Sequence, residues 1–158
     1  MLNLRIMSRS SLVAVVICML ISASVIGQNT KAKASINHVA VFVMSCKTTT
    51  AFYHDIVGLD TIPEPFHDGK HTWFKIGTNQ SMHVIEGADS KKEYYKNNHI
   101  CFTVGSVEAF TEVLKKNNIP YEDVAGNKGK ITTRVDNVKQ IWLQDPDGYW
   151  LEINDAKQ

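Results

Sequence analysis

The sequence contains two copies of one pattern, which begin 61 residues apart. Residues 37–43 read Asn-His followed by five mostly apolar residues that end in Val, and residues 98–104 repeat this order. Both segments are short and rich in β-branched and aromatic residues, so each predicts a buried strand. We therefore expect two similar structural units, because self-similarity at a fixed spacing reflects a repeated architecture.

The segments that follow the two strands also correspond. In the first copy, residues 45–50 form a polar helix start, and apolar residues at helical spacing continue from residue 51 to residue 57 before Gly58 ends the helix. In the second copy, Ser106 is the expected N-cap of a helix that ends at residues 117–120. Short strands follow in each half, at residues 61–62, 71–76, 81–86, 121–124, 131–135, 139–143 and 149–153. The predicted fold class is α+β, with two βαβββ modules.

The first 27 residues differ from the rest of the chain. Arg5 and Arg9 precede an apolar run at residues 12–26, which is followed by the small residue Gly27 and then by polar residues. This order is typical of a secretory signal, so residues 1–27 are the expected signal peptide, cleaved after Gly27. The run is shorter than the roughly 20 residues of a spanning helix, which leaves an N-terminal membrane anchor as the alternative. The mature protein is then periplasmic or secreted and makes no contact with the membrane.

Cysteine content and charge exclude some functions. Export permits a disulfide between Cys46 and Cys101, but two buried free thiols are the expected state. The formal net charge is +1, and Lys and Arg are scattered along the chain. This distribution argues against a nucleic-acid partner. Neither a Gly-x-Ser-x-Gly motif nor a Cys–His arrangement is readable, which disfavours nucleophilic catalysis.

Four ionisable residues occupy equivalent places in the two halves. His38 and His99 are the second residues of the opening segments, whereas His83 and Glu152 lie among apolar residues of the closing strands. Because side chains alternate between the faces of a strand, all four can point into one cup. Three imidazoles and a carboxylate would suit a divalent ion such as Zn, Ni, Co, Fe or Mn. The alternative is that the histidines are hydrogen-bonded core residues or surface residues.

Other residues are weaker candidates. His54 is expected to face solvent, and His67 and His71 flank a turn at the mouth of the cup. Arg134 and Lys128 could hold a substrate carboxylate, although ordinary surface charges are the favoured interpretation. We expect core packing, rather than a place in the cup or at an interface, for the tryptophans Trp73, Trp142 and Trp150.

Two longer motifs resemble a known superfamily. Residues 52–59 read Phe-Tyr-x-Asp-x-x-Gly-Leu, and residues 145–152 read Asp-Pro-Asp-Gly followed by three residues and Glu. With the two Asn-His segments, they are similar to the vicinal-oxygen-chelate superfamily of glyoxalases, bleomycin-resistance proteins and extradiol dioxygenases. The resemblance covers residues 35–155, divided into a module at 35–88 and a module at 97–155. It implies a curled mixed sheet that forms a cup around a metal, with His38, His99 and Glu152 at family ligand positions.

The resemblance leaves several functions open. Glyoxalase I-like lyases usually have Glu at the position of His83, and related epimerases usually have Gln. The favoured function is a glyoxalase I-like lyase or isomerase, in which the metal chelates two neighbouring oxygens of a small substrate and Glu152 and His83 act in catalysis. One alternative is a small extradiol-type Fe(II) dioxygenase that uses His38, His99 and Glu152 as ligands. Others are a non-catalytic antibiotic-binding protein and a transferase of the fosfomycin-resistance kind. A homodimer is expected, because family sites are often built from two chains.

Overall fold

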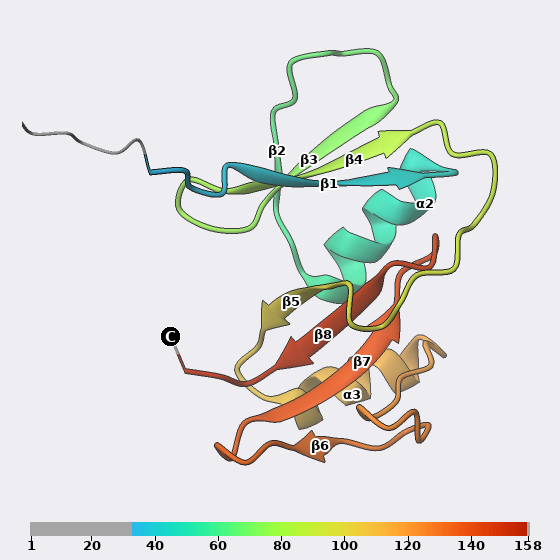
Figure 1. Ribbon diagram of the computed structural model, residues 1–158. Helices are drawn as coiled ribbons and strands as arrows, with labels where there is room; N and C mark the ends of the chain where they lie inside the picture. Colours follow the sequence, from blue (N-terminus) through green and yellow to red (C-terminus); the bar gives the residue numbers. More distant parts are fainter. Residues whose placement is uncertain (1–32, 158) are drawn as a thin grey trace, which may run out of the picture. The chain divides into compact units, whose positions relative to one another are not determined.

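The computed structural model describes residues 33–157, of which residues 36–157 belong to one compact unit (Figure 1). Residues 33–35 belong to the other unit, are exposed and have no regular secondary structure. The expected signal peptide lies outside the described residues. No helix within residues 33–157 is long and apolar enough to cross a membrane.

The first module begins with strand β1 (His38–Val43), which helix α2 (Cys46–Ala51) and the π-helix η2 (Phe52–Val57) follow. Three strands complete the module, namely β2 (Thr61–Ile62), β3 (His71–Lys75) and β4 (Ser81–Glu86). They form a sheet in the order β1-β4-β3-β2. Strand β1 is parallel to β4, and the other neighbours are antiparallel.

The second module repeats this arrangement (Figure 1). Strand β5 (His99–Thr103) precedes helix α3 (Val107–Lys116), and the strands β6 (Thr132–Thr133), β7 (Lys139–Gln144) and β8 (Trp150–Asn154) follow. The sheet order is β5-β8-β7-β6, again with a parallel first pair. The predicted α+β fold of two βαβββ modules is therefore confirmed.

The helices begin where the sequence predicts. The side chain of Ser45 accepts a hydrogen bond from the Thr48 N–H, and Ser106 does the same for Ala109 N–H, at 3.3 and 3.2 Å. Both serines satisfy an N–H group of the first turn that lacks a partner within the helix. Gly58 ends the first helical segment with φ of 84°, a left-handed conformation that glycine adopts without strain.

Each sheet packs one face against the core. Side chains that alternate along β1 and β4 are completely or almost completely buried, as are those along β7 and β8: Val41, Val43, Met82, Val84, Ile141, Leu143, Leu151 and Ile153. Each contributes roughly 1.5–3 kcal/mol by leaving water. We call the opposite face of each sheet its ligand face, because alternation places His38 and His83 on one and His99 and Glu152 on the other.

The structure differs from the sequence-based expectation in its helix and strand details. The predicted helix at residues 51–57 is α-helical only to Ala51 and then π-helical, a wider turn that accompanies burial of the adjacent Phe52 and Tyr53. The predicted strand at residues 121–124 is reduced to isolated bridges at Glu122, because the chain turns back through hydrogen bonds between Asp123 and Asn127. The strand expected at residues 131–135 retains only two residues.

Both cysteines of residues 33–157 are free thiols, but only one is buried. Cys46 is buried as expected. Cys101 is exposed, so the expectation of two buried thiols was wrong for this residue. The reason is strand parity, because Cys101 is two residues from His99 and shares the ligand face rather than the core face.

The turn before β8 joins the two modules. The Tyr53 hydroxyl donates a hydrogen bond to Asp145 Oδ2 at 2.9 Å, and the Thr49 hydroxyl donates to Asp147 Oδ2 at 2.6 Å. The Met44 N–H also donates to Asp147, at 2.7 Å. Both aspartates of the Asp-Pro-Asp-Gly motif therefore bind the first module, which is a structural role for that motif.

Burial changes the acidity of this junction. Asp145 is 2% exposed, and desolvation raises the pKa of its carboxyl to about 6, although hydrogen bonds from Tyr149 N–H, the Tyr53 hydroxyl and Asp147 N–H oppose the shift. A carboxyl with a raised pKa binds its proton more tightly in the folded state than in the unfolded state. Its contribution to stability is therefore present below about pH 4 and is lost as pH rises through about 6.

We predict that the Asp145→Asn variant loses this pH dependence. The asparagine oxygen can accept the two backbone bonds, and its amide can donate to the Tyr53 hydroxyl. Urea unfolding at pH 4 and pH 7 should show the stability of the wild type falling by roughly 2 kcal/mol relative to the variant, because one pKa unit equals about 1.4 kcal/mol and part of the effect is already lost at pH 4. A difference between the two proteins that is independent of pH would contradict the raised pKa.

Candidate metal centre

The strand register places the candidate residues at equivalent points of the two sheets. In the first sheet, His83 lies between Ala40 on β1 and Trp73 on β3. In the second sheet, Glu152 lies between Cys101 on β5 and Trp142 on β7. His38 and His99 open the first strand of each sheet, two residues before these rows. The register therefore places one ionisable residue, His83 or Glu152, at equivalent points of the two ligand faces.

The first pair of candidates, His38 and His83, lies among aromatic rings. Their ring centroids are 6.4 Å apart. His83 also packs against Trp73 at 4.6 Å, against His71 at 5.0 Å and parallel to the Phe66 ring at 5.8 Å. The result is a largely aromatic surface that contains three imidazoles.

Both members of the first pair can present a free nitrogen lone pair. The Nδ1 of His38 lies 2.9 Å from the Asn37 side-chain oxygen, which can only accept, so this nitrogen is the protonated one and Nε2 keeps its lone pair. His83 is 7% exposed, and its Nε2 has no hydrogen-bond partner among the described residues. Desolvation, with the charges of His71 and His38, lowers the pKa of His83. A neutral imidazole is the form that binds metals.

The second pair of candidates, His99 and Glu152, is in direct contact. Nε2 of His99 lies 3.3 Å from Glu152 Oε2. The other carboxylate oxygen accepts a hydrogen bond from Asn154 Nδ2 at 2.9 Å, and Arg134 Nη1 lies 3.9 Å from it. Glu152 is only 8% exposed, so these contacts compensate for burial of its charge. A nitrogen and an oxygen donor are thus already side by side.

Asn154 fixes the orientation of this carboxylate. Its side-chain oxygen accepts hydrogen bonds from the Thr103 hydroxyl and the Ala156 N–H, both at 3.2 Å. The amide nitrogen must then point to Glu152 and to Cys101 Sγ, which lies 3.1 Å away. Such supporting hydrogen bonds hold metal-binding carboxylates in place. Desolvation and the nearby Glu152 raise the pKa of the Cys101 thiol to about 11, so it is not a nucleophile.

The two pairs do not form one cluster within the described chain. Among residues 33–157, no group of three or more His, Cys, Asp or Glu side chains could hold a metal ion. Each ligand face by itself therefore presents only two of the four candidate ligands, and the four-ligand set needs both pairs. The composition of that set fits a divalent ion, because the buried Nε2 of His83 lacks a partner and the His99–Glu152 pair places N and O donors together.

The weaker candidates differ in how close they lie to the four candidate ligands. His54 and His67 are exposed, and neither contacts the four candidate ligands. His71, in contrast, opens β3 and packs against His83. Its Nδ1 lies 2.8 Å from Asp68 Oδ1, and the hydrogen bond from the Lys70 N–H and this contact lower the pKa of Asp68. Arg134 forms an ion pair with Asp136 and approaches Glu152, whereas Lys128 lines a separate pocket.

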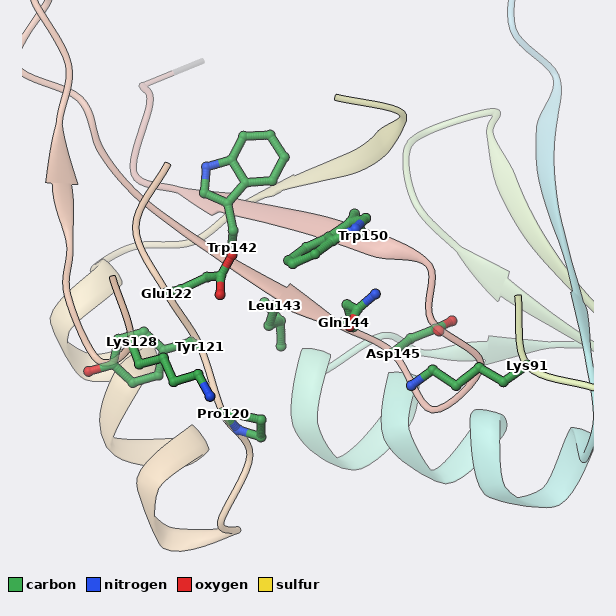
Figure 2. Close-up of a pocket in the computed structure, with 10 residues that line it drawn as sticks. All are labelled: Lys91, Pro120, Tyr121, Glu122, Lys128, Trp142, Leu143, Gln144, Asp145 and Trp150. Atoms are coloured by element: carbon green, nitrogen blue, oxygen red, sulfur yellow. The ribbon is translucent and has the colours of Figure 1, made fainter. Parts of the chain in front are cut away.

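That pocket has a volume of about 390 Å³ (Figure 2). Lys91 and Lys128 extend into it from opposite sides, and none of the four candidate ligands lines it. Its two acids have other partners, since Glu122 binds Lys96 and Asp145 belongs to the junction. We therefore place the chemistry on the ligand faces and not in this pocket.

Several residues of the ligand faces were not assigned to the site from the sequence. Trp73 and Trp142 were expected in the core, yet each is the cross-strand neighbour of a candidate ligand. Asn154 was not singled out. The available signal was side-chain alternation along the strands. Trp73 and Trp142 lie opposite His83 and Glu152 in register, and Asn154 is two residues from Glu152, so all three side chains point to a ligand face.

Comparison with known proteins places these residues in a family. The family described as the Glyoxalase/Bleomycin resistance protein/Dioxygenase superfamily matches residues 35–153. The chain is 26% identical over 125 residues to "Glyoxylase I 4" of Arabidopsis thaliana, covering 75% of this chain and 69% of that protein. It is also 26% identical over 129 residues to the uncharacterised protein YaeR of Escherichia coli K12, covering 75% of this chain and 93% of YaeR.

Solved structures share the fold. The oxidase ChaP-H1 superposes with a TM-score of 0.63 at 24% identity, covering 79% of this chain and 98% of that one. The fosfomycin resistance protein FosX of Listeria monocytogenes gives 0.63 at 22% identity, with 80% and 96% covered. A lactoylglutathione lyase from Agrobacterium tumefaciens gives 0.58 at 19% identity, with the same coverage. The chain belongs to the glyoxalase/bleomycin resistance protein/dioxygenase superfamily, also called the vicinal-oxygen-chelate superfamily.

Proposed function

We propose that this protein is a metal-dependent lyase or isomerase of the glyoxalase I kind. Its metal ligands are His38, His83, His99 and Glu152. One observation supports this most strongly: the two modules place complementary donor pairs at equivalent points of their ligand faces, two imidazoles on one and an imidazole with a carboxylate on the other. Similarity to the Arabidopsis glyoxylase favours the lyase or isomerase class over the alternatives.

The metal site is proposed to form between two copies of the chain. Within residues 33–157 the two pairs remain apart, and each pair alone is too small for a tetrahedral site. The first ligand face also exposes apolar side chains, among them Phe42 and Phe66, which are 50% and 53% exposed. A second copy that covers this face with its second module would bury these rings and complete the ligand set. We therefore propose a homodimer with two shared sites.

The chain's own residues supply orientation and proton transfer. A divalent ion bound there would act as a Lewis acid towards two neighbouring oxygens of a small substrate. Glu152, held by Asn154, is placed to take a proton from the substrate carbon and return it. His83 is a ligand or a second proton-transfer group, and the lowered pKa that burial gives it keeps the imidazole neutral.

The expected export of the chain limits the choice of substrate. We propose a periplasmic or secreted location, on the basis of the signal-like residues 1–27. Glutathione adducts are abundant in the cytosol, so a different oxygen-rich small molecule is the proposed substrate. An exported glyoxalase-like protein would then act on compounds outside the cytosol.

A second candidate function is an Fe(II) extradiol-type dioxygenase. His38, His99 and Glu152 would form a 2-His-1-carboxylate set, and His83 would be an acid or base. The presence of His83 where the lyases usually have Glu favours this alternative, and an oxidase shares the fold. A non-catalytic antibiotic-binding protein is less well supported, because four intact donors have no purpose in simple sequestration.

We predict one tightly bound divalent ion per chain. Protein expressed from residue 28 onward, purified without added metal, should contain the ion by elemental analysis, and the His99→Ala variant should lose it. His54→Ala is the matched control, since His54 is exposed and outside the site. Nickel, cobalt or zinc would support the lyase, and iron with oxygen uptake on catechol would support the dioxygenase. If the wild type binds no metal even when it is supplied, the proposed function is wrong.

The shared site predicts complementation between two inactive variants. The double variants His38→Ala/His83→Ala and His99→Ala/Glu152→Gln should each bind no metal. When they are unfolded together and refolded as a mixture, the heterodimer regains one intact site, so metal should reappear at about one ion per heterodimer. A mixture that stays metal-free while the wild type rebinds metal would place all four ligands within one chain.

A further inference from the structure

Two tryptophans occupy the same place in the two modules. Trp73 on β3 is the cross-strand neighbour of His83, and Trp142 on β7 is the cross-strand neighbour of Glu152. The two tryptophans are 69 residues apart, the same spacing that separates His83 from Glu152. Each module therefore places one indole directly beside the candidate ligand of its closing strand.

Both indoles pack against the candidate histidines. The Trp73 ring lies 5.6 Å from the His38 ring and 4.6 Å from the His83 ring. The Trp142 ring meets the His99 ring edge-on at 4.4 Å. Figure 2 shows the Trp142 indole extending from β7 on the side opposite Leu143, a core residue. These contacts place both rings at the ligands rather than in the core.

The indole nitrogens lack partners. Among the described residues, three buried side-chain nitrogen or oxygen atoms make no hydrogen bond, and they are Trp73 Nε1, His83 Nε2 and Trp142 Nε1. Trp142 is 4% exposed, and its N–H has no acceptor among the described residues. Proteins rarely leave a buried N–H group unpaired, because the cost is about 1–3 kcal/mol. All three unpaired atoms lie on the ligand faces.

Trp150 shows that this chain can satisfy an indole nearby. It begins β8, in register with His99, and its Nε1 donates to the Tyr94 carbonyl at 2.9 Å. The two tryptophans beside the ligands have no such internal acceptor. Their unpaired state is therefore a property of the two equivalent positions and not of every tryptophan in the domain.

We propose that Trp73 and Trp142 are substrate-positioning residues whose indole N–H groups donate hydrogen bonds to oxygens of the ligand bound at the metal. An indole N–H can only donate, so it selects an oxygen that accepts, such as carboxylate, carbonyl or phenolate. The ligand class is a small, oxygen-rich, anionic chelator with an acceptor oxygen on each side. This inference rests on the proposed metal function and adds the donors that would orient the ligand.

Nuclear magnetic resonance of the indole N–H groups tests the proposal directly. The mature chain has three tryptophans, so a ¹H–¹⁵N spectrum of zinc-loaded protein should show three indole signals. Zinc is diamagnetic and leaves the signals observable, and oxalate serves as the probe. We expect oxalate to shift the signals of Trp73 and Trp142 downfield and slow their exchange with water, while the signal of Trp150 stays in place.

Phenylalanine variants assign the signals and measure the effect. Trp73→Phe and Trp142→Phe keep an aromatic ring but lose the donor, so each should weaken oxalate binding by about tenfold while the zinc content is unchanged. Trp150→Phe is the matched control and should bind oxalate like the wild type. If one variant fails to fold, the other two still assign all three signals, and the wild-type titration remains decisive.

The outcomes separate this inference from the proposed function. Zinc and oxalate binding with unmoved signals of Trp73 and Trp142 would overturn the positioning role and leave the metal function intact. Wild-type oxalate affinity in both Trp73→Phe and Trp142→Phe would also overturn the positioning role and leave the metal function intact. Failure to bind zinc would overturn the metal function, and the positioning role with it. Selective shifts at the two equivalent tryptophans, with weaker binding in both variants, would support the proposal.

Discussion

The alternation of side chains along β4 and β8 is the constraint on which the rest of the structure depends. Met82 and Val84 enter the core from β4, and Leu151 and Ile153 do so from β8. The residues between them must then point to the opposite face. A register slip of one residue would bury His83 and Glu152 in the core and expose four large apolar side chains. Core packing therefore determines where the candidate ligands point.

The repeat applies the same alternation of side chains to both sheets, so each sheet carries candidate ligands. One module alone presents two of the four candidate ligands, too few for a tetrahedral metal centre. Two modules supply four donors because the same parity holds in both sheets. The Asp-Pro-Asp-Gly turn serves a different purpose, since Asp145 and Asp147 bind Tyr53 and Thr49 of the first module. The two longest family motifs thus help to hold the modules together, and the second motif also ends in the candidate ligand Glu152.

The sequence predicted the order of elements well because their signals are local. Ser45, Ser106 and Gly58 mark helix ends through contacts within a few residues. The repeat also located the four candidate ligands. The short strand expected at residues 121–124 was wrong, because a turn held by Asp123 and Asn127 outweighs β-propensity there.

The unassigned site residues depend on pairing between distant strands. Trp73 and Trp142 look like core residues when the sequence is read one strand at a time, because large aromatic side chains are usually buried for packing. Only the register places them beside His83 and Glu152. His71 is similar, since it lies next to a turn in the sequence but contacts His83 across the sheet.

Charge connects the unusual His83 with the kind of ligand that the site would bind. If the four candidate residues hold a divalent ion, three imidazoles and one carboxylate would leave the ion with net positive charge, whereas a second carboxylate at position 83 would neutralise it. This remaining charge would favour an anionic chelator. Arg134 beside Glu152 and the two unpaired indole N–H groups add donors of the same polarity. The replacement of a carboxylate by His83 is therefore consistent with an acidic, oxygen-rich substrate rather than a neutral one.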